Sequence, residues 1–431
     1  MGDQRSFRKL LTERTDNRRI TIMKTSKLIG LSAALTALAP HFPIAAQALD
    51  PWDSIQDIPG LYMVRSSGRA AGVDPVSGAV FTLGTVALNT DGTAAAAIHR
   101  TQDGGATWTT NLLWQNGKQC SFNAFAGDPS SGLLYAGGYA GNEWIVYRSD
   151  DGGDNWYPDH VPFQYAPGKT ANCRGLAADG QGRVYAVGYA DGNPTKKSQS
   201  SGFWVVRKRN ADGIWSTVDA QSGASSPAGP FAVAVHSDGG VFVVGELNAA
   251  WTVRYLSPTP GASWTPVDTY QPNKAQARAQ AIAIDSNGAI YVAGFAGGPY
   301  VKGRSASHWV VRRSATGAPG TWNDVDWSLP YAAACGIVMV PRPGNLPDEI
   351  FVTGRAVMEG ALHWLVRRAV ADAALTPDNG WRFSDDYLYP GGVEASANAV
   401  TSDAQGDIYT IGSAFDGGDV SHWITRKLAV P

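Results

Sequence analysis

The chain has 431 residues, of which 44% are hydrophobic and 17% charged, with 50 glycines and 15 tryptophans. This length supplies a large core, and many glycines together with many aromatics are typical of short strands joined by tight turns. Without residues 1–48, the chain carries 27 basic and 34 acidic residues, a net charge of −7. That charge argues against nucleic acid and anionic membranes as general partners.

Residues 1–48 have the pattern of an N-terminal extension followed by a secretory signal peptide. From Met23 the segment reads MKTSKLIGLSAALTALAPHFPIAAQA, with two lysines, an apolar run and a small-residue cleavage site. The apolar run is too short to anchor the chain, and no later segment reaches the length of a membrane span. We expect export to the periplasm or the exterior, and a monomeric, soluble domain over residues 49–431.

A repeated unit recurs along residues 49–431 every 49 to 63 residues. Each copy contains an aromatic-x-x-Gly segment: FTLG (81–84), YAGG (135–138), YAVG (185–188), FVVG (242–245), YVAG (291–294), FVTG (351–354) and YTIG (409–412). An alternating stretch precedes this segment, a stretch such as WVVRK follows it, and a turn leads to a further tryptophan. Each copy therefore indicates four short strands. Seven such units predict an all-β, seven-bladed β-propeller.

The seventh unit lacks its fourth strand, and a counterpart lies at the other end of the predicted domain. PWDSIQD (51–57) resembles the fourth-strand segments TWNDVDW and SWTPVDT, and Trp52 supplies the missing turn tryptophan. We expect this N-terminal strand to complete the last blade and close the ring, which removes an unpaired edge.

Acidic, glycine-rich turns follow the third strands of the first two units: RTQDGGATW (100–108) and SDDGGDNW (149–156), with SPTPGASW (257–264) as a relaxed copy. Such loops often bind metals or phosphates. Most other units lose the aspartate but keep the tryptophan, however, which favours a structural turn in which Asp bonds backbone N–H groups and Gly adopts positive φ. We expect no metal and no cofactor.

On these turn motifs the chain resembles the Asp-box (BNR) repeat β-propeller superfamily, which includes sialidases, xyloglucan-active glycosidases and photosystem assembly factors. The resemblance covers nearly all of residues 49–431 and implies a sialidase-like scaffold. It does not extend to sialidase chemistry, because the Arg-Ile-Pro element of that family is absent and the nearest string, VPRPG (340–344), has the wrong order.

Candidate binding residues recur where the first strands begin, on the face opposite the Asp-box turns. The polar ones are Arg69, Asn123, Arg174, Arg278, Gln280 and Asn398. Three guanidinium groups around a central funnel suit a carboxylate or sulfate, although polar side chains and water ordinarily line a propeller centre. Nearby loops hold Tyr62, Tyr165, Tyr270 and Tyr331, which suit stacking on sugar rings or pack the loops together.

Three residues are candidates for acid–base chemistry on the same face. Glu394 with Tyr389 is the best pair by sequence position, and His160 is a candidate base. Three further histidines, His308, His363 and His422, each precede a strand tryptophan. Their equivalent positions favour packing within the repeat over a metal site. The arginines three residues after the strand tryptophans are expected to be solvated or to form ion pairs with a neighbouring blade.

Two functions are consistent with this pattern. In the first, an exported propeller binds an acidic glycan at its funnel, and the sequence leaves open whether it also cleaves that glycan as a glycoside hydrolase or polysaccharide lyase. In the second, a non-catalytic propeller of the cell envelope binds a protein partner or assists assembly. The sequence leaves open whether Cys120 and Cys173 form a disulfide or whether all three cysteines are separate thiols.

Overall fold

The computed structural model describes residues 48–61, 65–87, 94–113, 118–159, 162–191, 202–222, 229–301, 304–344 and 346–430. These residues belong to one unit of the chain, Pro43–Pro431. The expected N-terminal extension and signal peptide lie outside the described residues, apart from Ala48.

The strands follow one another in sets of four. The first strands are β2 (Ser67–Val73), β6 (Cys120–Gly127), β10 (Ala171–Ala178), β14 (Gly229–Val235), β18 (Ala277–Ile284), β22 (Ala332–Val340) and β26 (Glu394–Ser402). The second strands are β3 (Val80–Ala87), β7 (Leu134–Ala140), β11 (Val184–Asp191), β15 (Val241–Leu247), β19 (Ile290–Val301), β23 (Glu349–Met358) and β27 (Ile408–Phe415).

The outer strands complete each set. The third strands are β4 (Ala94–Thr101), β8 (Glu143–Ser149), β12 (Gly202–Arg209), β16 (Ala250–Leu256), β20 (Arg304–Ser314), β24 (Ala361–Val370) and β28 (Ser421–Leu428). The fourth strands are β5 (Thr109–Leu113), β9 (Tyr157–Pro158), β13 (Trp215–Ser222), β17 (Thr265–Tyr270), β21 (Asn323–Pro330), β25 (Arg382–Tyr387) and β1 (Trp52–Pro59). A single 3-10 turn, η1 (Pro272–Lys274), accompanies them in the described part of the chain.

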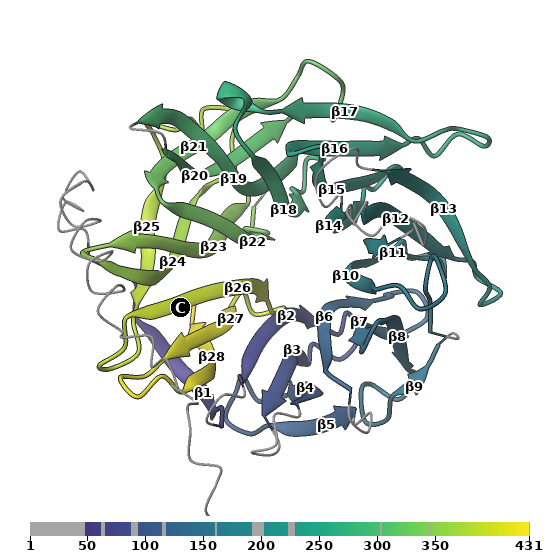
Figure 1. Cartoon of the computed structure of the whole chain (residues 1–431), viewed down its shortest axis with the longest axis horizontal. Coiled ribbons are helices and arrows are strands. Elements are labelled where there is room, and N and C mark those ends of the chain that lie inside the picture. The colour runs from purple at the N-terminus through teal and green to yellow at the C-terminus, as the bar shows by residue number, and fades with distance from the viewer. Residues whose placement is uncertain are drawn as a thin grey trace, which may run out of the picture. The chain divides into compact units, whose positions relative to one another are not determined.

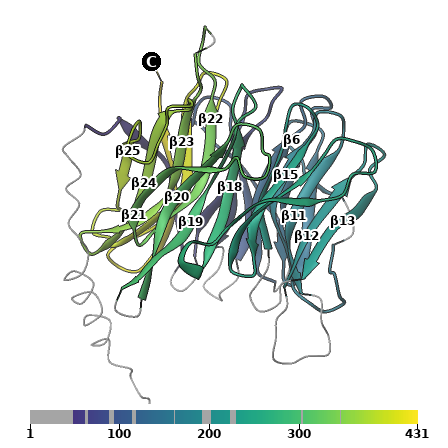
Figure 2. The ribbon, with the colours of Figure 1, turned by 90° about the horizontal axis from the view of Figure 1, so that it is seen from above.

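The sets form antiparallel sheets arranged as blades, with the first strands innermost (Figure 1). Five sheets contain four strands each, and the remaining eight strands form one sheet because a single parallel pair, Leu362 with Glu394, joins β24 to β26. Figure 2 shows the strands of neighbouring blades side by side in a view turned by 90°. The all-β expectation and the four-stranded blades are confirmed.

Two contacts connect the ends of this series of blades. β1 pairs antiparallel with β28, with Trp52 opposite Leu428 and Pro59 opposite His422. Each first strand contacts the first strand of the next set, and β26 contacts β2. The segment from 52 to 59 therefore occupies the fourth-strand position of the last set, beside the end of the chain.

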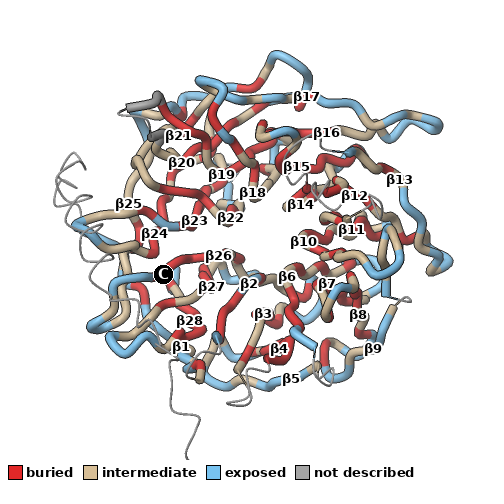
Figure 3. The backbone as a smooth tube through the Cα atoms, in the orientation of Figure 1, coloured by how far each residue is buried: buried red, intermediate tan, exposed pale blue. Residues whose placement is uncertain are grey.

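The core between the blades is built around six third-strand tryptophans, each fully buried: Trp144, Trp204, Trp251, Trp309, Trp364 and Trp423. Figure 3 shows buried residues along the sheets and exposed residues at their margins. The glycine of the aromatic-x-x-Gly segment lets the tryptophan of the preceding blade approach. A Cβ atom at Gly188 would lie 3.0 Å from the Trp144 ring and 1.9 Å from the Asn172 carbonyl oxygen, so only glycine fits there.

Buried ion pairs join four of the blades to the next along the chain. Arginines on third strands pair with aspartates on the fourth strand of the preceding blade: Arg254 with Asp219 (2.8 Å), Arg312 with Asp268 (3.0 Å), Arg367 with Asp326 (3.0 Å) and Arg426 with Asp385 (2.7 Å). Both side chains of each pair are at most 10% exposed. The alternative of inter-blade ion partners is confirmed for these four arginines.

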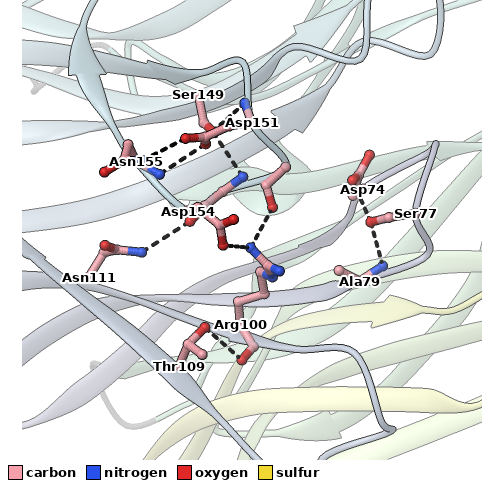
Figure 4. Close-up of polar contacts among 12 residues, drawn as sticks. Asp74, Ser77, Ala79, Arg100, Thr109, Asn111, Ser149, Asp151, Asp154 and Asn155 are labelled. Atoms are coloured by element: carbon pink, nitrogen blue, oxygen red, sulfur yellow. Dashed lines mark hydrogen bonds and ion pairs between the residues drawn. The ribbon is translucent and has the colours of Figure 1, made fainter.

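The turns after β4 and β8 have Asp-box geometry. Asp103 accepts hydrogen bonds from the backbone N–H and hydroxyl of Thr107 (2.9 and 2.6 Å) and from the hydroxyl of Thr101 (2.8 Å). Asp151 makes the same set of bonds with Asn155 and Ser149 (Figure 4). The carboxylates thus hold the turns closed, as expected of a structural motif.

The second Asp-box turn also contacts the first blade (Figure 4). Arg100 donates to the carbonyl oxygen of Gly152 (3.0 Å) and pairs with Asp154, while Asn111 donates to the carbonyl oxygen of Gly153 (3.1 Å). Gly152 and Gly153 have φ values of +70° and +93°, which L side chains rarely adopt. The turn therefore connects two blades as well as two strands.

We predict that the Asp103 turn stabilises the fold in a pH-dependent way. Hydrogen bonds from Thr107 hold the pKa of Asp103 at about 2, below its ordinary value of 3.8. Because the folded-state pKa is the lower one, this stabilisation is complete above pH 4 and is lost as the pH falls towards 2. Urea unfolding should show Asp103→Asn less stable than the parent chain at pH 7, with the difference shrinking between pH 4 and pH 2.

Asp150→Asn is the matched control for that experiment, because its side chain is 56% exposed and its ion pair with Arg148 is 3.8 Å long. A difference between Asp103→Asn and the parent chain that stays constant from pH 7 to pH 2 would contradict the role assigned to the carboxylate.

We predict that breaking one inter-blade ion pair destabilises the fold strongly. Asp219→Ala leaves the buried guanidinium of Arg254 without its counter-ion, a change that typically costs about 3 kcal/mol in the free energy of unfolding. The double variant Asp219→Leu, Arg254→Met removes both charges and should regain most of that loss. Urea unfolding at pH 7 measures both, and equal losses in the single and double variants would exclude the ion pair as the cause.

Candidate functional site

Every first strand contains a β-bulge at an equivalent residue. The pairing of first and second strands skips one residue in each set, and these residues are Arg69, Asn123, Arg174, Phe231, Gln280, Cys335 and Asn398. A bulge leaves its extra residue out of the ladder and redirects its side chain. We call these seven residues the bulge layer. It contains five of the six polar residues predicted from the sequence, and the sixth, Arg278, lies two residues before Gln280.

Three amide side chains of the bulge layer link neighbouring blades. Asn123, Gln280 and Asn398 each donate to a backbone carbonyl just before the next bulge residue. The acceptors are the carbonyl oxygens of Cys173 (3.3 Å), Ala334 (2.7 Å) and Gly68 (2.8 Å). These amides therefore satisfy backbone groups that the bulges leave unpaired, so part of their hydrogen-bonding capacity is already used.

Arg174 is held by stacking rather than by charge. Its guanidinium lies 4.5 Å from the ring centre of Tyr189 and 4.3 Å from that of Phe231. Burial lowers the pKa of Arg174 to about 10, so the group stays charged at neutral pH. Among the described residues it has no hydrogen-bond or ion-pair partner. The aromatic rings thus fix the plane of a half-buried cation whose N–H groups find no acceptor in the described part of the chain.

Arg278 differs from Arg174 because it has a counter-ion. Its Nε atom lies 2.7 Å from Oε2 of Glu246, a carboxylate that is fully buried. Glu246 also accepts hydrogen bonds from Gln276 at 2.9 and 3.1 Å. The guanidinium of Arg278 lies 4.8 Å from the ring centre of Phe231. The Phe231 ring therefore contacts two guanidinium groups, and the one on Arg278 is paired with a carboxylate.

A second group of arginines surrounds Arg69, whose own side chain is exposed. The pKa of Arg69 is lowered, chiefly because the surrounding protein limits its contact with water, and the charges of Arg65 and Arg355 act in the same direction. Arg355 directly follows the FVTG segment and was missed in the sequence analysis. Its equivalents in other units are Tyr189, which contacts Arg174 of the bulge layer, and Glu246, which pairs with Arg278. The position of Arg355 in the repeat therefore indicated a residue close to the bulge layer.

The predicted aromatic residues are dispersed. Tyr165 is 41% exposed and stacks on Phe203, with ring centres 4.8 Å apart. Tyr270 donates to Asp324 (2.9 Å) and lies beneath Arg312, so its contacts are with outer strands. Tyr331 connects β21 to β22 with a φ of +57°. Tyr62 lies outside the described residues.

Of the three acid–base candidates, the structure describes two. The hydroxyl of Tyr389 donates to Oδ2 of Asp57 (2.9 Å) rather than to Glu394. Partial burial and this bond to Asp57 raise the pKa of Tyr389 to about 12, which opposes its ionisation. Glu394 is exposed at the start of β26. His160 lies outside the described residues.

The three histidines of the repeat each contact the fourth strand of their own blade. His308 stacks on Trp327, with ring centres 5.2 Å apart, whereas His363 and His422 bind Asp386 and Asp57, each at 2.6 Å. Among the described residues, no group of three or more His, Cys, Asp and Glu side chains is placed to hold a metal ion. The cysteines are free thiols, with Cys120 and Cys173 buried and Cys335 half-buried.

Comparison with known proteins identifies the repeat. Residues 165–194 match the model of a β-propeller repeat, SBBP, and no curated protein sequence matches the chain. Together with the blades and the turns at Asp103 and Asp151, this match defines a β-propeller scaffold of Asp-box type, as the sequence motifs predicted. Within the described part of the chain, no helix has the length and hydropathy of a membrane span.

Three solved structures illustrate what the chain is similar to. YCF48 bound to a D1 peptide shares 13% identity over 90% of this chain and 100% of that chain, with a TM-score of 0.49. The intramolecular trans-sialidase from Ruminococcus gnavus, in complex with oseltamivir carboxylate, shares 12% over 90% and 99%, with a TM-score of 0.44. The α-L-arabinofuranosidase Arb93A from Fusarium graminearum shares 13% over 86% and 96%, with a TM-score of 0.48.

Proposed function

We propose that residues 49–431 form an exported, seven-bladed β-propeller that binds an acidic glycan at the bulge layer. The observation that carries this proposal is Arg174, a half-buried cation that stacks on Tyr189 and Phe231 and makes no ion pair with a described residue. A guanidinium held in this way presents a planar set of N–H donors that matches a carboxylate or sulfate.

In this proposal, seven blades form a ring and the site lies at its centre. Each of the seven sets of strands supplies one bulge residue, and the contact of β26 with β2 supports a closed ring. β1 then serves as the fourth strand of the last blade, through its pairing with β28. Closure in this way joins the two ends of the domain without leaving a free sheet edge between them.

Other groups beside Arg174 suit a sugar acid. The guanidinium of Arg278 contacts the same Phe231 ring and adds positive charge, although Glu246 partly offsets it. The amide oxygen atoms of Asn123 and Asn398 each accept one hydrogen bond, from Ser121 and Ser396, and can accept a second from a sugar hydroxyl. The exposed Tyr165 ring offers a surface for stacking on a pyranose.

Cleavage of the glycan is a separate proposal, in which a glycoside hydrolase or lyase uses Glu394, Tyr389 or His160. The bond from Tyr389 to Asp57 and the raised pKa of Tyr389 favour binding without catalysis.

The same bond and raised pKa favour the second candidate function, a non-catalytic propeller of the cell envelope that binds a protein partner. In that case, Arg174 would bind an acidic side chain of the partner.

We predict that residues 49–431 bind acidic oligosaccharides but not neutral ones of equal length, and that Arg174→Ala raises the Kd about tenfold or more. The reason is the loss of a charge-assisted hydrogen-bonded pair, worth about 1.5–3 kcal/mol. Isothermal titration calorimetry with oligogalacturonates and malto-oligosaccharides measures binding, and reducing-end formation measures cleavage.

Arg183→Ala is the matched control, because Arg183 lies in the same unit and pairs with Asp179 in a turn on the other face. Binding that survives Arg174→Ala would move the site elsewhere. Absence of binding across acidic saccharides would overturn the glycan proposal and favour protein partners.

We predict that closure depends on Trp52, which is 8% exposed and donates from Nε1 to the hydroxyl of Ser384 (3.0 Å). Trp52→Ala should lower the free energy of unfolding by about 3 kcal/mol and raise the hydrogen-exchange rates of β28 amides. Asp53→Ala, an exposed change on the same strand, is the control. Unchanged exchange in β28 after Trp52→Ala would contradict closure by β1.

A further inference from the structure

Four arginines near the bulge layer make no ion pair with a described residue. One of them, Arg65, stacks on Phe415, with its guanidinium 5.1 Å from the ring centre. The other three are Arg174, Arg69, in the bulge layer itself, and Arg355, directly after the FVTG segment. These three lie on β10, β2 and β23, and so on three different blades. We call Arg174, Arg69 and Arg355 the three unpaired arginines.

The strand pairing places Arg355 beside the bulge layer. Arg355 is opposite Ala333, two residues before the bulge residue Cys335. Tyr189 is opposite Asn172, two residues before the bulge residue Arg174, and its ring contacts the Arg174 guanidinium at 4.5 Å. The equivalent register therefore directs Arg355 towards the same layer, and its side chain is exposed there.

The charges around these arginines are unbalanced. The carboxylate of Glu246 already pairs with Arg278, and although its charge also acts on Arg174, it forms no ion pair with any of the three unpaired arginines. Arg69 and Arg355 are close enough that the charge of Arg355 acts on the protonation of Arg69. Like charges at short range repel one another, and bound anions relieve that repulsion. Arg69 and Arg355 thus form one cationic centre, and the stacked Arg174 forms another.

We propose, building on the proposed function, that the ligand carries at least two anionic groups, one bound by Arg174 and another by Arg69 together with Arg355. Acidic sugars joined in a chain have this chemistry, because a carboxylate recurs on each residue. A single uronic acid fills only one of the two centres. The ligand class is therefore an oligouronate or a similarly charged oligosaccharide, and Arg355 is a binding residue of the second centre.

The test uses residues 49–431 with galacturonic acid, di- and trigalacturonate, and the methyl ester of the trimer, in isothermal titration calorimetry at constant salt. We expect the affinity to rise at least tenfold from the monomer to the di- or trimer, and the neutral ester to lose that rise. Arg355→Ala should reduce the ratio of trimer to monomer affinity about tenfold, whereas Arg174→Ala should weaken both ligands. Arg183→Ala should leave both affinities and the ratio unchanged.

The outcomes separate this inference from the proposed function. If monomer and trimer bind equally through Arg174, or if Arg355→Ala weakens both to the same extent, the second centre is refuted and the acidic-glycan site remains. If none of the acidic saccharides binds, both proposals are overturned. Melting temperatures of the variants, measured alongside, identify any loss of binding caused by unfolding.

Discussion

The packing of a third-strand tryptophan against the glycine of the next blade is the contact on which the rest of this structure depends. It sets how closely two sheets approach, because a Cβ atom at Gly245 would lie 2.8 Å from the Trp204 ring. The buried arginine–aspartate pairs then fix the lateral register of the same sheets. A blade packs its tryptophan against the next blade and its glycine against the tryptophan of the preceding blade. Blades of the same design therefore pack in series.

Because these packing contacts lie on the other strands, the innermost strands are freer to vary in sequence. The tryptophans and ion pairs lie on third and fourth strands, while the seven bulge residues are of five types: arginine, asparagine, phenylalanine, glutamine and cysteine. The scaffold fixes where a side chain lies, and the local sequence decides its chemistry. Arg174 and Arg278 show this contrast: Arg278 pairs with the buried carboxylate of Glu246, whereas Arg174 contacts aromatic rings.

The sequence predicted the blades well because their packing residues recur. Tryptophan, glycine and alternating small residues appear at the same offsets in successive units, and β1 was recognisable because residues 51–57 resemble other fourth-strand segments. The bulges were not predictable, because an extra residue in a short strand leaves no distinctive pattern. Arg355 was missed because its position recurs but its residue type does not: the equivalent residues in other units include tyrosine, glutamate and phenylalanine. The partners of Tyr389 and Tyr270 depend on segments distant in sequence, namely β1 and β21.

The pairing of β1 with β28 has a consequence for how the chain folds. Trp52 lies opposite Leu428, so the strands that complete the last sheet are separated by almost the whole domain. The entropy of closing so large a loop must be overcome before this contact stabilises anything. The middle blades can collapse first from local hairpins, and the final sheet forms only after β28 has been synthesised. Until then, β28 presents an open edge, and this interval is when the chain is most exposed to aggregation.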